Sequence, residues 1–223
     1  MKLVHPDISY QIEFKENEYN VLILENPTNF TRFCQGLFEQ CSGEEGRFVL
    51  SEGEEIIAIT KKMYMIVDPF SLEFNQRRIL NKLYAILKET AVSDAMYVRT
   101  NEMLNKMEHY ILELLEQVEY PIIYEEQMDL AGIFKMAEVK VATTYDSLTE
   151  KIIDYLKIMN DICGLPICVF VNMKAYFTME EMIKIYEYAD YNKIFILLIE
   201  NTERQKMEME KRYICDKDGC EIY

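Results

Sequence analysis

Residues 166–201, PICVFVNMKAYFTMEEMIKIYEYADYNKIFILLIEN, decide the fold class of this 223-residue chain. The two apolar runs at 166–172 and 194–201 are typical of buried strands. Between them, Thr178 and Glu181 form a capping-box pattern, which predicts the start of a helix with one apolar face. A strand–helix–strand unit of this length favours parallel pairing of its two strands. The sequence therefore predicts an α/β protein.

The second run ends in a sharp change of polarity, from IFILLI to the polar residues 200–203. In open α/β sheets, ligands bind at such strand ends. A nucleotide would need a phosphate loop, G-x-x-x-x-G-K-[ST], after the first buried strand, which we expect at residues 20–25. The segment that follows is ENPTNF, which contains neither glycine nor lysine. We therefore expect neither ATP hydrolysis nor kinase activity.

The middle of the chain has a different pattern from its two ends. Residues 1–68 indicate short strands and one helix, capped by Thr28 or Asn29, whereas residues 74–118 are almost entirely helical in character. Apolar seams step by three and four residues along two of the expected helices, at 104–118 and 148–162, and we expect them to pack helix on helix within the chain. VKVATT is a further candidate for a brief strand. The sequence predicts an α/β head formed by residues 1–70 and 160–223, with an α-helical leg, residues 71–159, inserted between them.

Composition limits the possible functions. With 39 acidic and 24 basic residues the net charge is −15, which disfavours DNA binding unless the basic residues cluster. The six cysteines form no C-x-x-C pair and there are only two histidines, so a zinc site is not expected. No apolar run approaches the roughly 20 residues of a membrane span, and the N-terminus lacks the apolar region of a signal peptide. We expect a cytoplasmic protein with reduced thiols.

Basic residues do cluster in NQRRILNK, residues 75–82. Arg77, Arg78 and Lys82 lie within about a turn and a half at the start of a predicted helix. Lys61 and Lys62 precede the strand that leads to this helix. The cluster indicates either a solvated helix start or a patch that contacts phosphates.

Acidic residues gather in EQVEYPIIYEEQMD, residues 116–129, on both sides of a bend at Pro121. Hard cations such as calcium take several oxygen ligands from such a junction. The candidate ligands are Glu119, Glu125, Glu126 and Asp129, and the alternative is a solvated acidic turn. The terminal DKDG is too near the chain end for a twelve-residue calcium loop, and it predicts a turn with Gly219 at positive φ.

Several of these stretches together resemble one family. EGRFVLSE, IVDPFSLEFNQRRILNKLYAIL, VFVNMKAYFTMEE, IFILLIEN and the terminal DKDGCEIY are similar to the Csn2 family of CRISPR-associated proteins from type II-A systems. The similarity extends over residues 1–223, in the same order and at similar spacing.

This resemblance implies a function without catalysis. Members of the family take part in spacer acquisition with the CRISPR integrase proteins and the effector nuclease. The resemblance implies a P-loop-like head without a phosphate loop, a helical leg, and a homotetrameric ring held by calcium near the head–leg junction. It also implies sequence-independent binding of double-stranded DNA ends through basic residues that line the ring, for which Arg77, Arg78 and Lys82 are the first candidates and Lys61 and Lys62 the next. The alternative is an acidic α/β scaffold that only docks other proteins.

Overall fold

A computed structural model describes residues 1–124 and 128–222. It divides the chain into two compact units, one formed by Met1–Glu73 with Thr144–Tyr223 and the other by Phe74–Thr143. The first unit is mixed α/β, and the described residues of the second form three helices. Each unit is described by itself below.

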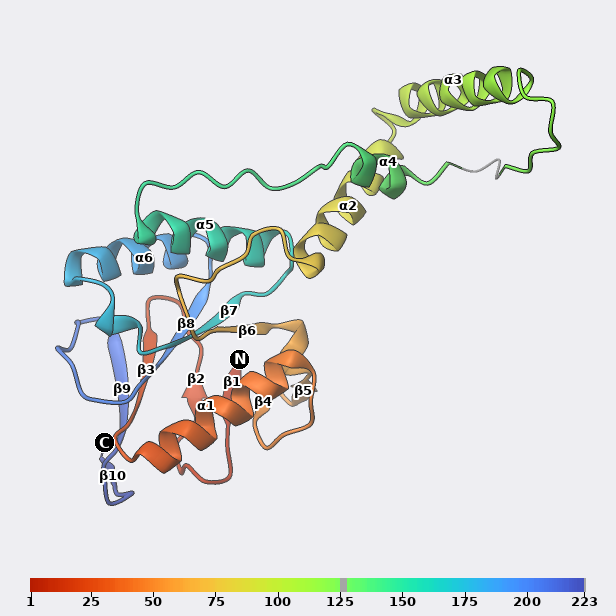
Figure 1. The fold of residues 1–223 in the computed structure, drawn as a ribbon. Helices are drawn as coiled ribbons and strands as arrows, with labels where there is room; N and C mark the ends of the chain where they lie inside the picture. The colour runs from red at the N-terminus through yellow and green to blue at the C-terminus, as the bar shows by residue number, and fades with distance from the viewer. Residues whose placement is uncertain (125–127, 223) are drawn as a thin grey trace. The chain divides into compact units, whose positions relative to one another are not determined.

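The first unit is built on a six-stranded sheet, which confirms the predicted α/β class (Figure 1). Its strand order is β10-β9-β3-β8-β7-β6, and every pair is parallel except β10 with β9. The predicted strand–helix–strand unit is present, because β7 pairs in parallel with β8 and the helix α6 connects them. The strands are β3 (Tyr19–Leu24), β6 (Met63–Ile66), β7 (Ile167–Val171), β8 (Phe195–Glu200), β9 (Glu210–Cys215) and β10 (Glu221–Ile222).

Helices cover both faces of this sheet. Helix α1 (Pro27–Ser42) lies over one face, while α5 (Leu148–Asp161) and α6 (Met179–Tyr191) pack side by side over the other (Figure 1). The strands are therefore buried on both sides and read as continuous apolar runs. In β3, Leu22 and Leu24 belong to the core beneath α1, and Ile23 between them faces the opposite layer.

A second, antiparallel sheet extends the core beneath α1, in the order β2-β1-β4-β5. Its strands are β1 (Lys2–Val4), β2 (Ile12–Glu13), β4 (Val49–Glu52) and β5 (Glu55–Ile57), and the short 3-10 helix η1 (Ile59–Lys61) follows. The sequence did not predict β1, whose three residues are too few for a visible pattern. His5 follows it and is buried, with its ring centroid 4.5 Å from the rings of both Phe33 and Phe48.

Local capping explains where the helices start. Helix α1 begins earlier than predicted, because Asn26, rather than Thr28 or Asn29, is the N-cap. Helix α6 has the complete predicted capping box of Thr178 and Glu181. At the end of the chain, Gly219 has a φ of 83°, which confirms the predicted turn between β9 and β10.

The second unit contains α2 (Arg77–Ala91), α3 (Tyr97–Leu115) and α4 (Leu130–Met136). The expected strand at VKVATT does not form, because its backbone is held by side chains instead: Asn75 exchanges hydrogen bonds of 3.1 and 2.8 Å with Val141. Tyr84 of α2 donates to the Val139 carbonyl (3.1 Å), which places this segment along α2.

The predicted helical seams have different outcomes. The seam of α5 is packed, with Ile152, Tyr155 and Met159 buried, and α5 belongs to the first unit rather than to the residues inserted in it. The seam of α3 is not packed as expected. None of its residues is buried, and Ile111 and Leu114 are among the exposed apolar side chains.

Candidate functional site

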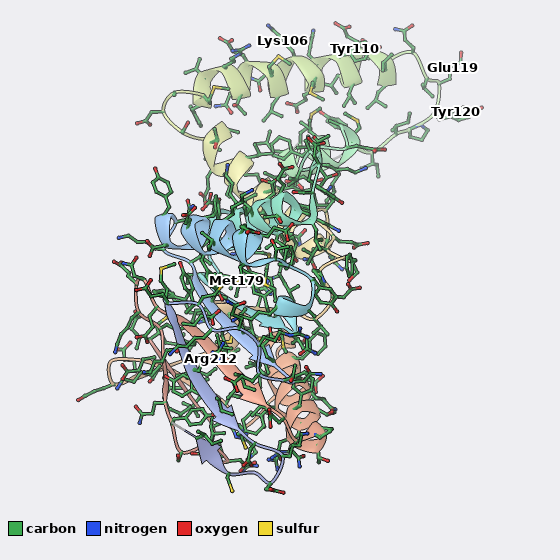
Figure 2. The ribbon with its side chains drawn as sticks, turned by 90° about the vertical axis from the view of Figure 1, so that its left-hand side faces the viewer. Lys106, Tyr110, Glu119, Tyr120, Met179 and Arg212 are labelled. Carbon is green, nitrogen blue, oxygen red and sulfur yellow. The ribbon has the colours of Figure 1, made fainter. Side chains whose placement is uncertain are left out.

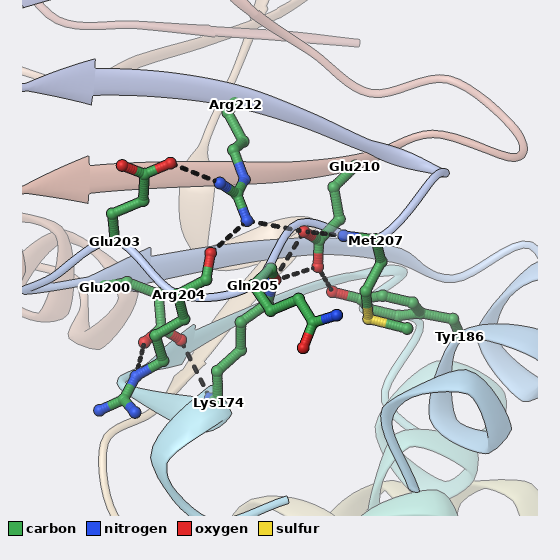
Figure 3. A network of polar contacts seen from close by, with 9 residues as sticks. All are labelled: Lys174, Tyr186, Glu200, Glu203, Arg204, Gln205, Met207, Glu210 and Arg212. Atoms are coloured by element: carbon green, nitrogen blue, oxygen red, sulfur yellow. Dashed lines mark hydrogen bonds and ion pairs between the residues drawn. The ribbon is translucent and has the colours of Figure 1, made fainter. Parts of the chain in front are cut away.

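The carboxyl end of β8 is occupied by the protein's own side chains (Figure 3). Glu200, the last residue of the strand, is 1% exposed, and its Oε1 accepts from the backbone N–H of Lys174 (3.1 Å). Its Oε2 lies 3.6 Å from Nε of Arg204 and has no hydrogen-bond partner among the residues that the structure describes. Burial raises the pKa of the Glu200 carboxyl, and the Lys174 N–H and the Arg204 guanidinium oppose that rise.

A buried ion pair adjoins this strand end. The Lys174 side chain, in the 3-10 helix η2 (Met173–Ala175), and the Glu210 side chain at the start of β9 are 7% and 0% exposed, and their charged atoms are 2.6 Å apart. Glu210 also accepts from the Tyr186 hydroxyl of α6 (3.0 Å) and from the Met207 N–H (3.1 Å). Three polar partners, from η2, α6 and the segment before β9, therefore bond both oxygens of this buried side chain.

The segment between β8 and β9 is hydrogen-bonded to the same network (Figure 3). Lys174 donates to the Gln205 carbonyl (3.0 Å), and Arg212 donates to the Glu203 carboxylate (2.8 Å) and to the Arg204 carbonyl. The change from apolar to polar residues at Glu200 therefore coincides with an internal hydrogen-bond network that holds residues 201–209. Sequence analysis missed Lys174 and Glu210, because only the fold brings them together.

The turn where a phosphate loop would lie is closed by a side chain. Asn26 Oδ1 accepts from the N–H groups of Thr28 (3.0 Å) and Asn29 (3.2 Å), and Pro27 has no N–H. The backbone donors that would hold a phosphate are thus satisfied within the chain or missing.

The predicted basic residues lie in two places. Arg77, Arg78 and Lys82 are all exposed on the first turns of α2. Arg77 and Lys82 have no carboxylate partner in the part of the chain that the structure describes. Lys61, exposed, and Lys62, half-buried, end the short helix η1 in the other unit. The structure therefore places Arg77, Arg78 and Lys82 on one helix of the second unit, and Lys61 and Lys62 belong to the first unit.

The candidate calcium ligands are only partly described. Asp129 caps α4 through the Ala131 N–H (3.2 Å) and forms an ion pair with Lys88 (2.6 Å), whose hydrogen bond lowers the pKa of the Asp129 carboxyl. Glu119 is exposed, and Glu125 and Glu126 lie outside the described residues. Residues 1–124 and 128–222 contain no group of three possible metal ligands. Because calcium takes about six to eight oxygens, Asp129 and Glu119 alone do not fit it.

These features define a mixed α/β protein with a sealed strand end, a capped helix start in place of a phosphate loop, and one exposed basic helix start. The family model described as "CRISPR-associated protein (Cas_Csn2)" matches residues 40–219. The chain therefore belongs to the Csn2 family of CRISPR-associated proteins, as the sequence resemblance indicated.

Curated relatives agree with this assignment. A CRISPR-associated protein Csn2 from Streptococcus agalactiae is 25% identical over 185 residues, 81% of this chain and 80% of the relative. Another, from Enterococcus faecalis, is 23% identical over 160 residues, 70% of each chain.

A solved structure of a putative ABC transporter (ATP-binding protein) from Pyrococcus furiosus covers 95% of this chain and 97% of its own, with 13% identity and a TM-score of 0.41. None of the helices in the described part of the chain is long and apolar enough to cross a membrane.

Proposed function

We propose that this CRISPR-associated protein binds the ends of double-stranded DNA, without sequence preference, during spacer acquisition. The observation that carries the proposal is the start of α2, where Arg77, Arg78 and Lys82 are exposed together. Lysine and arginine contacts to phosphates supply the sequence-independent part of DNA affinity.

The placement of these cations supports a ligand of negative charge. A helix N-terminus carries partial positive charge, and acidic residues are the favourable ones there. Helix α2 has no acidic residue in its first turn and no side-chain cap, yet it starts with two arginines. This arrangement costs helix stability in the free protein, and a bound phosphate would remove that cost.

The distribution of charge also supports the proposal. Residues 74–143 hold 8 of the 24 basic residues and 11 of the 39 acidic ones, so most of the acidic excess belongs to the first unit. At physiological salt the Debye length is about 8 Å, so any carboxylate farther than that from a duplex on α2 would be largely screened.

We further propose that the protein acts as a homotetrameric ring stabilised by calcium, that it is not an enzyme, and that it works in the cytoplasm with the CRISPR integrase proteins and the effector nuclease. The exposed apolar side chains of α3 supply a surface that a second copy could cover. Calcium would be held by Glu119, Glu125, Glu126 and Asp129, and it would neutralise their mutual repulsion.

Gel shifts with linear duplex test the proposal directly. Changing Arg77 and Arg78 to Ala should weaken binding to every linear duplex alike. The slope of log affinity against log salt concentration should become less steep by about 0.9 per lost phosphate contact. Changing Lys157 and Lys184 to Ala is the matched control, because it removes two exposed helical charges elsewhere. A closed ring threads free ends, so relaxed circles should bind far more weakly than linear fragments.

Two results would contradict the proposal. If the arginine variant binds DNA like the wild type, the start of α2 is only a solvated helix end. If neither linear nor circular duplex binds, the acidic first unit favours the other candidate, a scaffold that docks proteins.

A further inference from the structure

A cluster of aromatic side chains lies exposed on the first unit, where β6 and β7 end. Phe70 and Tyr176 follow these two strands, and their rings meet edge to face with centroids 5.3 Å apart. Phe70 is 61% exposed and Tyr176 is 44% exposed. Val67 and Met179 beside them in the sequence are also exposed apolar residues, and Figure 2 labels Met179 at the start of α6. Large apolar side chains exposed together commonly mark an interaction surface.

A nearly buried lysine links Phe70 of this cluster to a third aromatic residue, Tyr145. Lys151 of α5 is 7% exposed, and its ammonium donates to the Phe70 carbonyl (2.6 Å). The same ammonium lies 5.4 Å from the ring centre of Tyr145, which is a cation–π distance. Lys151 therefore joins the Phe70 backbone to the Tyr145 ring, and the Phe70 ring in turn contacts Tyr176.

The segments that carry the rings are acidic in sequence. The three segments that carry them, 67–73, 144–151 and 172–181, contain six acidic residues and two basic ones. Both basic residues, Lys151 and Lys174, are largely buried and already bonded. The acidic residues are Asp68, Glu73, Asp146, Glu150, Glu180 and Glu181, of which all but Glu181 are exposed.

Aromatic faces carry negative partial charge and attract cations, most strongly the flat guanidinium of arginine. Acidic neighbours add attraction for a cation and repel phosphates. We propose that Phe70, Tyr145 and Tyr176 form a docking surface for a segment of a partner protein that presents arginine side chains. The surface lies wholly within the first unit and does not depend on the proposed DNA binding.

The test uses the full chain and a labelled Gly/Ser peptide with evenly spaced arginines, measured by fluorescence anisotropy at low salt. We expect saturable binding, weaker binding of the matched lysine peptide, and none of the matched glutamate peptide. Changing Phe70 or Tyr176 to Ala should weaken binding of the arginine peptide about fivefold, which corresponds to about 1 kcal/mol. Tyr176→Phe, which keeps the ring, should bind like the wild type.

Tyr191 provides the matched control, because it is an 88% exposed tyrosine elsewhere on the same unit. Tyr191→Ala should leave peptide binding unchanged. The proposal is overturned if the wild type shows no saturable binding, if Phe70→Ala and Tyr176→Ala bind like the wild type, or if the glutamate peptide binds equally well. Binding of labelled oligothymidylate that Phe70→Ala abolishes would assign the surface to single-stranded nucleic acid. A lower sedimentation mass of that variant would assign it to a second copy of the chain.

Discussion

Lys174 and Glu210 form the most deeply buried ion pair in the described part of the chain. Removing one partner of such a pair leaves the other charge buried without compensation, which costs about 3–5 kcal/mol. We expect Lys174→Met to lower the free energy of unfolding by that amount in urea titrations. Tyr186→Phe, which removes only one hydrogen bond to Glu210, should cost less. An equal or smaller loss for Lys174→Met would show that the pair does not stabilise the sheet.

Glu200 should respond to pH in the opposite direction from a paired carboxylate. Its pKa is raised by burial, so the ionised form destabilises the folded state. This destabilisation is absent below the unfolded pKa of about 4.3 and grows as pH rises toward the higher folded pKa. Glu200→Gln should therefore raise the melting temperature at pH 7 and have little effect below pH 4. A lower melting temperature at pH 7 would show that the Arg204 contact outweighs burial.

The start of α2 is where function and stability should conflict. Arg77→Glu places a favourable charge at the helix N-terminus and should stabilise the protein by about 0.3–1 kcal/mol. The same change should weaken DNA binding more than Arg77→Ala does, because it adds repulsion. Thermal melts and gel shifts on the two variants check this expectation. If Arg77→Glu both destabilises the protein and binds DNA normally, the arginine has a packing role.

Among the helices and strands, the long apolar runs could be predicted from sequence and the short or irregular segments could not. Strands β7 and β8 and helix α6 could be predicted because burial on both faces leaves continuous apolar runs and Thr178 and Glu181 mark the helix start. Strand β1 was missed because three residues show no period. VKVATT, the expected brief strand, is held by Asn75 and Tyr84, a tertiary effect that overrides local pattern.

The same limits apply to the candidate site. Arg77, Arg78 and Lys82 could be grouped from sequence because neighbours at helical spacing share a surface. The network of Lys174, Glu210 and Glu200 joins residues up to 36 positions apart, which no local pattern reveals. The predicted packing of the α3 seam was wrong for a different reason. Its period is real, but none of its residues is buried in the described chain, so a seam alone does not say what covers it.

The exposed apolar side chains of α3 offer a test of assembly. Changing Ile111 and Leu114 to Lys should leave the monomer folded, because neither side chain is buried. If a second copy covers this face, light scattering should show a mass of about four chains for the wild type and a lower mass for the variant. The exposed polar pair Glu102→Ala and Lys106→Ala on the same helix is the control and should keep the wild-type mass. A wild-type monomer would contradict the tetramer.

Calcium should act on stability and assembly together. A site that binds only the folded protein stabilises it by RT ln(1 + [L]/Kd), about 2.7 kcal/mol at a hundredfold excess over Kd. For a chain of this size that corresponds to a rise in melting temperature of roughly 5–11 °C. Changing Glu125 and Glu126 to Gln should reduce this rise and make the mass insensitive to chelator, since the remaining candidates, Glu119 and Asp129, supply too few oxygens. Lys88→Ala, which frees Asp129 from its ion pair, should keep or increase the rise. An undiminished rise in the double variant would place any bound calcium elsewhere, and no rise in the wild type would remove calcium from the assembly.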